Sequence, residues 1–132
     1  MQLNKVNYNE LNAKQKENYN FHKVAAALAE YGYNSMRLND DWQGADFIAV
    51  HIDGKDMLKI QLKGRLTVDE KYLKDEDLYI AFIEDDSIKI YKHIDAVNLM
   101  PEKTKNTESW AQRGGYSWGK TPKHYESIIK VL

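Results

Sequence analysis

The chain has 132 residues, of which 42% are apolar and 30% charged, and its 19 basic and 20 acidic side chains leave a formal charge of -1. This length fits one compact domain, and the composition is typical of a folded, water-soluble protein and excludes a disordered chain. No apolar run approaches the roughly 18 residues that cross a bilayer, and the N-terminus lacks the apolar core of a secretory signal. We therefore expect one domain over residues 1–132, located in the cytoplasm and without a membrane partner.

Several classes of chemistry lack the residues that they require. The chain contains no cysteine, which excludes disulfides, zinc fingers and cysteine nucleophiles. Its four histidines do not have the spacing of zinc hydrolases, and no glycine-rich nucleotide-binding motif or G-x-S-x-G motif is present. Because the net charge is close to zero, any binding of nucleic acid must come from a local basic patch.

A helix is predicted first, over about residues 12–31. Gly32 stands where a left-handed residue ends a helix. Apolar residues recur with helical spacing at Phe21, Val24, Leu28 and Tyr31. This segment is expected to lay one apolar stripe against the rest of the domain.

Strands follow the helix. Alternation predicts a strand over 33–38, and a cluster of turn-forming residues predicts a turn over 39–44. Two hairpins come next, one within residues 44–65 and one over 78–93 with Asp85–Asp86 near its turn.

The remainder of the chain is less regular. A charged stretch separates the two hairpins, and no element is assigned to it. The last third is expected to form short helices and loops, ending in a helix that Thr121 caps and Pro122 begins. One helix, a run of strands and then further helices predict an α/β or α+β sandwich.

The first hairpin places polar side chains together. If Asp53-Gly54 forms a two-residue turn, the residue numbers of paired positions sum to 107, and Asp46 lies opposite Gln61. Lys63 projects from the same face, because strand side chains alternate with a period of two. Three polar groups therefore gather at one end of a hairpin that is otherwise largely apolar.

Two interpretations of this cluster are open. Asp46 and Lys63 could form a structural ion pair, braced by the amide of Gln61. Alternatively, the carboxylate and the amide oxygen could hold a hard cation while the lysine ammonium steadies an attacking water and the negative charge that develops during phosphodiester hydrolysis.

Three further acids have two interpretations each. Glu17 lies on the helical azimuth of the apolar stripe, so it either points toward the sheet and the site or is solvated near Lys14. Asp40 and Asp41 either add metal ligands or satisfy backbone amides of the turn.

The segment 110–125 is basic and aromatic and contains no acid. Its cations suit phosphates and its aromatics suit stacked bases, so it is a candidate nucleic-acid surface. Equally, the aromatics could pack as a small satellite core. The residues are Arg113, Lys120 and Lys123, with Trp110, Tyr116, Trp118 and Tyr125 between them.

The arrangement of these motifs resembles the PD-(D/E)xK nuclease superfamily. The likeness covers about residues 16–65: a helix with an acid near its start, G-A-D-F in a strand, and Q-L-K at the end of the next strand. It is similar in particular to members in which glutamine replaces the second acid, as in methylation-dependent restriction endonucleases. Ala45 stands where the superfamily's proline precedes the first acid.

The resemblance implies a restriction-endonuclease-like mixed sheet flanked by helices, and DNA cleavage that depends on Mg²⁺ or Mn²⁺. It implies Asp46 as the principal metal ligand, Gln61 in the second-acid position and the Leu62 carbonyl as a further ligand. Lys63 would be the catalytic lysine and Glu17 the helix acid.

We therefore expect a metal-dependent DNA endonuclease, with a homodimer as a possible assembly. The residues expected to contact DNA are Arg65, Arg113, Lys120, Lys123 and Trp118. The alternative is a non-catalytic module of the same fold that binds nucleic acid or a protein partner, since Gln61 brings no charge to the site.

Overall fold

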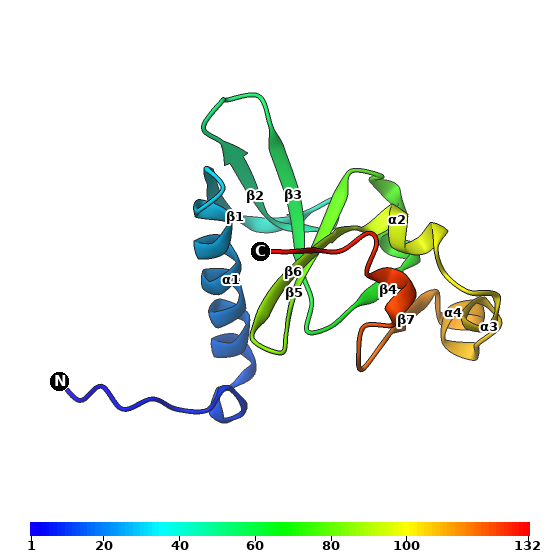
Figure 1. Cartoon of the computed structure of the whole chain (residues 1–132), viewed down its shortest axis with the longest axis horizontal. Coiled ribbons are helices and arrows are strands. Elements are labelled where there is room, and N and C mark those ends of the chain that lie inside the picture. The colour runs from blue at the N-terminus through cyan, green and yellow to red at the C-terminus, as the bar shows by residue number, and fades with distance from the viewer.

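The computed structural model describes residues 1–132, except for the side chain of Asp41. Its centre is a six-stranded mixed sheet in the order β1-β2-β3-β5-β6-β8, in which β3 and β5 are parallel and the other neighbours antiparallel (Figure 1). The strands are β1 (Tyr33–Trp42), β2 (Ala45–His51), β3 (Met57–Leu62), β5 (Leu78–Glu84), β6 (Ser87–Lys92) and β8 (Lys130–Val131). The predicted mixed α/β fold is confirmed.

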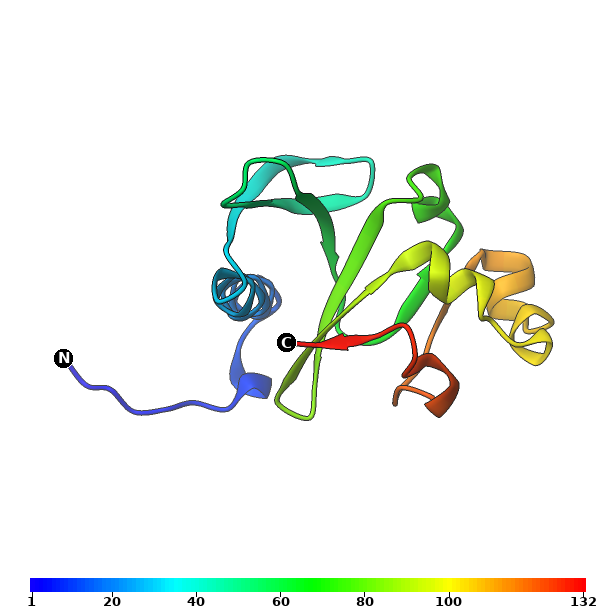
Figure 2. The ribbon, with the colours of Figure 1, turned by 45° about the horizontal axis from the view of Figure 1, so that its top comes forward.

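The long helix α1 (Ala13–Ala29) covers one face of the sheet and appears nearly end-on in Figure 2. It begins at a capping box, in which the side chain of Asn12 accepts the N–H of Gln15 and the side chain of Gln15 accepts the N–H of Asn12, both at 2.9 Å. It ends just before Gly32, which has the expected left-handed φ of +85°.

The helix-side core lies between α1 and the sheet. Its buried members are Phe21, Val24, Leu28, Phe47, Ala49, Ile60, Ala81 and Ile90. The aromatic rings of Phe21 and Phe47 meet edge to face, with centroids 5.0 Å apart. The apolar stripe predicted for the helix is therefore the stripe that packs.

Shorter elements cover the other face. They comprise the 3-10 turns η2 (Glu70–Lys74) and η3 (Lys123–Tyr125), the helices α2 (His93–Asn98), α3 (Glu102–Lys105) and α4 (Glu108–Arg113), and a two-stranded sheet of β4 (Thr67–Asp69) and β7 (Gly115–Ser117). A further 3-10 turn, η1 (Tyr8–Glu10), precedes α1 and has no buried residue. The second core lies between these elements and the sheet, and includes Leu66, Val68, Tyr72, Leu78, Ile80, Phe82, Tyr91 and Tyr125.

The register predicted for the first hairpin is confirmed, but its turn is not. Every pair from Phe47 with Ile60 to Val50 with Met57 sums to 107. The loop spans residues 52–55, closed by the N–H of His51 and the carbonyl of Asp56 at 2.9 Å. A four-residue loop centred on the Asp53–Gly54 bond keeps the same register as the predicted two-residue turn, because it adds one loop residue next to each strand.

The turn predicted over 39–44 is shorter than expected. Strand β1 continues to Trp42, with an irregular register after Arg37, and only Gln43–Gly44 turns, at φ values of 53° and 90°. A Cβ on Gly44 would lie 2.8 Å from the ring of Tyr72, so a side chain is excluded there by packing as well as by φ.

The second hairpin is confirmed, with Asp85–Asp86 at φ values of 51° and 60° in its turn. The charged stretch before it, to which the sequence assigned nothing, forms β4 and η2. No helix among the described residues is long and apolar enough to cross a membrane.

The predicted C-terminal helix is wrong. One 3-10 turn, η3, is followed by β8, which pairs with β6. Thr121 does not cap a helix, because its N–H and hydroxyl both donate to the carboxylate of Glu84, at 3.0 and 3.1 Å. The N–H of Leu132 extends the new strand by donating to the carbonyl of Ile88 at 2.8 Å. Pairing with the open edge of β6 therefore decides the structure of this segment, although its local sequence favours a helix.

Candidate functional site

The site begins where β2 starts and β3 ends. The carboxylate of Asp46 accepts the backbone N–H of Leu62 through Oδ2 at 2.9 Å, and the amide Nε2 of Gln61 donates to the carbonyl of Leu62 at 3.2 Å. All three residues are half-buried. Asp46 and Gln61 therefore hold the two backbone groups of one residue, as expected for side chains that share a sheet face in the observed register.

Lys63 continues the line of β3. Its N–H donates to the carbonyl of Ala81 at 3.0 Å, which extends the pairing with β5 by one residue. Its ammonium lies 5.2 Å from the ring centroid of Tyr72, and the ammonium of Lys71 lies 5.1 Å from the same ring. Both distances are within the range of cation–π attraction. The ring therefore restrains the side chain that the sequence singled out as the catalytic lysine.

Tyr72 is a site residue that sequence reasoning missed. It is 3% exposed, and burial raises the pKa of its hydroxyl, with the negative charges of Asp69 and Asp46 adding to the shift and Lys71 opposing it. Its ring also meets His93 edge to face, with centroids 5.5 Å apart. Tyr72 thus links Asp46 and Lys63 to the second core, although it comes from a charged stretch without periodic pattern.

Glu17 reaches the neighbourhood of Asp46. The two carboxylates line one hollow of about 350 Å³, together with Asp40. Glu17 is half exposed and lies 3.7 Å from the guanidinium of Arg37 and 3.6 Å from the ammonium of Lys14. The helix acid therefore stands in the same hollow as the strand acid, held by two cations. The side chain of Asp41 lies outside the described part of the structure.

The oxygen donors here are those that hard cations prefer: two carboxylates, an amide and a backbone carbonyl. Among the described side chains, no group of three His, Cys, Asp or Glu residues could hold a metal ion. The donor set suits Mg²⁺ or Mn²⁺ in kind, but a cation would depend on neutral oxygens and on the phosphate more than in a site with three acids.

Of the residues predicted to contact DNA, one lies beside Lys63 and the others lie elsewhere. Arg65 is exposed and lines a hollow next to Lys63. Lys120 and Lys123 are exposed on the C-terminal segment, and Arg113 lies 3.9 Å from Glu108. None of the last three lines a hollow that contains Asp46 or Lys63.

Trp118 is half-buried, with its ring between those of Tyr116 and Tyr125 at centroid distances of 4.7 and 5.0 Å. With Trp110 it packs against the second core. The aromatic residues of segment 110–125 therefore pack as part of the core.

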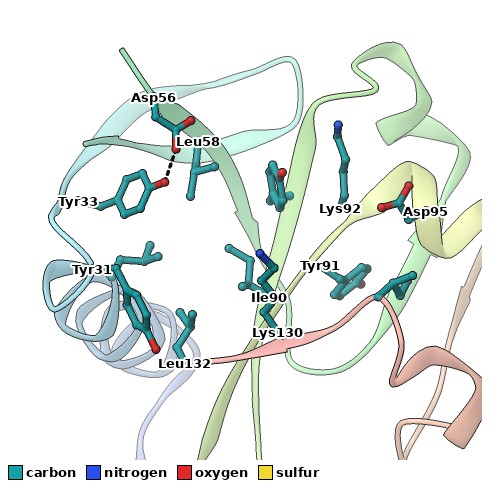
Figure 3. A pocket seen from close by; sticks show the side chains of 13 residues that line it. Tyr31, Tyr33, Asp56, Leu58, Ile90, Tyr91, Lys92, Asp95, Lys130 and Leu132 are labelled. Carbon is teal, nitrogen blue, oxygen red and sulfur yellow. Dashed lines mark hydrogen bonds between the residues drawn. The ribbon is translucent and has the colours of Figure 1, made fainter. Parts of the chain in front are cut away.

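A further hollow of about 440 Å³ lies near the C-terminal end of α1, away from these residues (Figure 3). Apolar side chains such as Leu58, Ile90 and Leu132 line it, and the hydroxyl of Tyr33 donates to the carboxylate of Asp56 at its edge. This hydrogen bond raises the pKa of Tyr33 to about 12. The hollow contains none of the predicted site residues.

No protein-family model matches the chain, and no curated protein sequence matches it at a significant level. A solved structure of a bacterial homing endonuclease, I-Ssp6803I, matches with a TM-score of 0.51 and 13% identity, over 85% of this chain and 78% of that one. The chain therefore resembles this endonuclease in fold. At this identity the likeness concerns only the arrangement of helices and strands. In the present chain that arrangement brings Asp46, Gln61 and Lys63 to one end of the sheet.

Proposed function

We propose that this nuclease-like domain is a metal-dependent DNA endonuclease of the PD-(D/E)xK type. The observation that carries the proposal is the register of β2 and β3, which fixes Asp46 on the backbone of Leu62, with Gln61 and Lys63 on either side of it. The likeness in fold to a homing endonuclease supports it.

The residues have distinct roles in this proposal. Asp46, Glu17, the amide of Gln61 and the carbonyl of Leu62 would hold the metal, and a Mg²⁺ or Mn²⁺ bound at such a site supplies water activation and neutralises phosphate charge. Lys63 places a positive charge where negative charge develops on the phosphate, and the ring of Tyr72 limits the positions that its ammonium samples.

The test is cleavage of supercoiled plasmid and of linear duplex DNA with Mg²⁺ or Mn²⁺. Lys63→Ala is expected to reduce the rate by about 100-fold or more, as for loss of one transition-state stabilising group. Lys71→Ala is the matched control, because it removes the other ammonium from the ring of Tyr72. Cleavage that persists in Lys63→Ala, or that is lost equally in Lys71→Ala, would contradict the assignment.

A second candidate function is a non-catalytic module that binds nucleic acid or a protein partner. It is favoured by the finding that the described side chains contain no group of three acids or histidines able to hold a metal. Calorimetry with Mn²⁺ separates the two functions. An endonuclease should bind Mn²⁺ and lose that binding in Asp46→Asn, whereas a non-catalytic module should show no Mn²⁺ binding in either protein.

We also propose that the endonuclease cuts duplex DNA as a homodimer, since the described residues form one such site and a duplex has two strands. Light scattering of the protein, alone and with DNA, would show a mass of two chains in the cutting species. A monomer that cleaves both strands in one binding event would contradict this.

A further inference from the structure

A wide hollow of about 1000 Å³, here called the basic groove, opens beside Lys63. One wall comes from the start of α1 with Lys16, one from the segment Lys63–Arg65 after β3, and one from Ser109 and β7 with Tyr116. A Cβ built on Gly64 would meet no atom within 4 Å, so the backbone between Lys63 and Arg65 is open to an approaching molecule.

The groove concentrates positive charge in a chain whose formal charge is -1. Its lining holds three cations, Lys16, Lys63 and Arg65, and one acid, Asp69, a local balance of +2. None of the three cations forms an ion pair among the described side chains. Lys16 instead lies 5.4 Å from the ring centroid of Tyr8, as Lys63 does over the ring of Tyr72. Three cations without a carboxylate partner are available to an anionic ligand.

The neighbouring hollows carry the opposite sign. Lys63 also lines a hollow whose other charged residues are Asp85 and Asp86, a balance of -1. The hollow that holds Asp46 contains three acids and two cations, again -1. An anionic chain at Lys63 is therefore attracted along the basic groove and repelled on the side of the Asp85–Asp86 turn.

We propose that the basic groove binds the sugar-phosphate backbone of one strand of duplex DNA, which passes from Lys16 over Gly64 to Arg65. This inference rests on the proposed function, because it places the strand next to Lys63, which follows the residue whose backbone N–H Asp46 accepts. It assigns DNA contacts to Lys16 and moves the main DNA surface away from Lys120 and Lys123. Phosphate contacts position the duplex and carry little sequence information.

The experiment measures binding of a fluorescein-labelled duplex by anisotropy, without divalent metal, at several salt concentrations. Each phosphate contact that is removed lowers the slope of log affinity against log salt by about 0.9. The double variant Lys16→Gln/Arg65→Gln should therefore lower the slope by about 2 and weaken binding at least about ten-fold. Lys55→Gln, on the loop at the other end of β2 and β3, removes one exposed charge outside the groove and should keep the wild-type slope.

Three results would overturn the proposal that the groove binds DNA. The double variant Lys16→Gln/Arg65→Gln could keep the wild-type slope, or the slope could fall instead in Lys120→Gln/Lys123→Gln. The third is a wild-type protein that does not bind DNA. Because metal is omitted, the result does not depend on cleavage. A protein that binds through the groove and cuts no DNA with Mg²⁺ or Mn²⁺ would support the groove and refute the endonuclease proposal.

Discussion

The buried histidine of the second core gives a prediction whose size follows from the structure. His93 is fully buried, and its Nε2 accepts the backbone N–H of Asp69 at 3.0 Å. Its Nδ1 has no hydrogen-bond partner among the described residues. Burial lowers the pKa of His93 from 6.5 to about 4, against a small opposing effect of Asp69. The folded protein therefore holds this side chain neutral, and protonation must be forced upon it.

The sign of the pH dependence follows from proton counts. Between pH 6.5 and about 4 the unfolded chain binds a proton at His93 and the folded chain does not, so stability falls as the pH falls through this window. With about 1.4 kcal/mol for each pH unit, the loss is about 2 kcal/mol by pH 5 and about 3 kcal/mol once the pH is below 4.

Urea unfolding at pH 7, 6 and 5 measures this loss. The titration stops at pH 5 because carboxyls with lowered pKa values, such as Asp75 and Glu84, lose their own contribution to stability at lower pH. His93→Gln keeps an oxygen that can accept a hydrogen bond but cannot titrate, so its stability, although lower at pH 7, should change little over this range. His22→Gln, at an exposed position, should retain the wild-type pH dependence. If His93→Gln loses as much stability as the wild type between pH 7 and pH 5, the assignment of the effect to His93 is refuted.

Two substitutions test the packing around the site. Tyr72→Leu removes the ring over which Lys63 lies and should slow cleavage by about 2- to 30-fold, equivalent to about 0.5–2 kcal/mol of cation–π attraction, whereas Tyr72→Phe keeps the ring and most of the rate; equal losses in both would assign the effect to the hydroxyl. Phe47→Ala empties the centre of the helix-side core and should lower the free energy of unfolding by about 3–5 kcal/mol. Ile52→Ala, at a side chain that is 85% exposed, should change it by less than about 0.5 kcal/mol in the same urea titration.

Local rules predicted the hairpin because its register is overdetermined. Alternation fixes which face of β2 and β3 is buried, and a slip by one residue would move Phe47 and Ile60 from the core to the opposite face. The Asp-Gly pair identifies the centre of the loop even though the loop has four residues. The capping residue of α1 and its apolar stripe are local signals of the same kind.

Long-range contacts decided what the sequence did not predict. The C-terminal segment has a helical start signal in Thr121 and Pro122, yet a carboxylate from β5 takes both donors of Thr121. The role of Tyr72 depends on where η2 docks, which no pattern within the charged stretch reveals. Such contacts join residues that are far apart in the chain, so neither periodicity nor turn chemistry can indicate them.

The first turns of α1 explain how an almost neutral chain presents two surfaces of opposite sign. Lys16 and Glu17 are adjacent in sequence, and successive helical residues are rotated by about 100°, so the two side chains enter different hollows. Glu17 adds negative charge beside Asp46, where oxygen ligands would hold a cation, and Lys16 adds positive charge to the groove that would hold phosphates. A net charge of -1 therefore conceals a separation of charge between neighbouring positions of one helix.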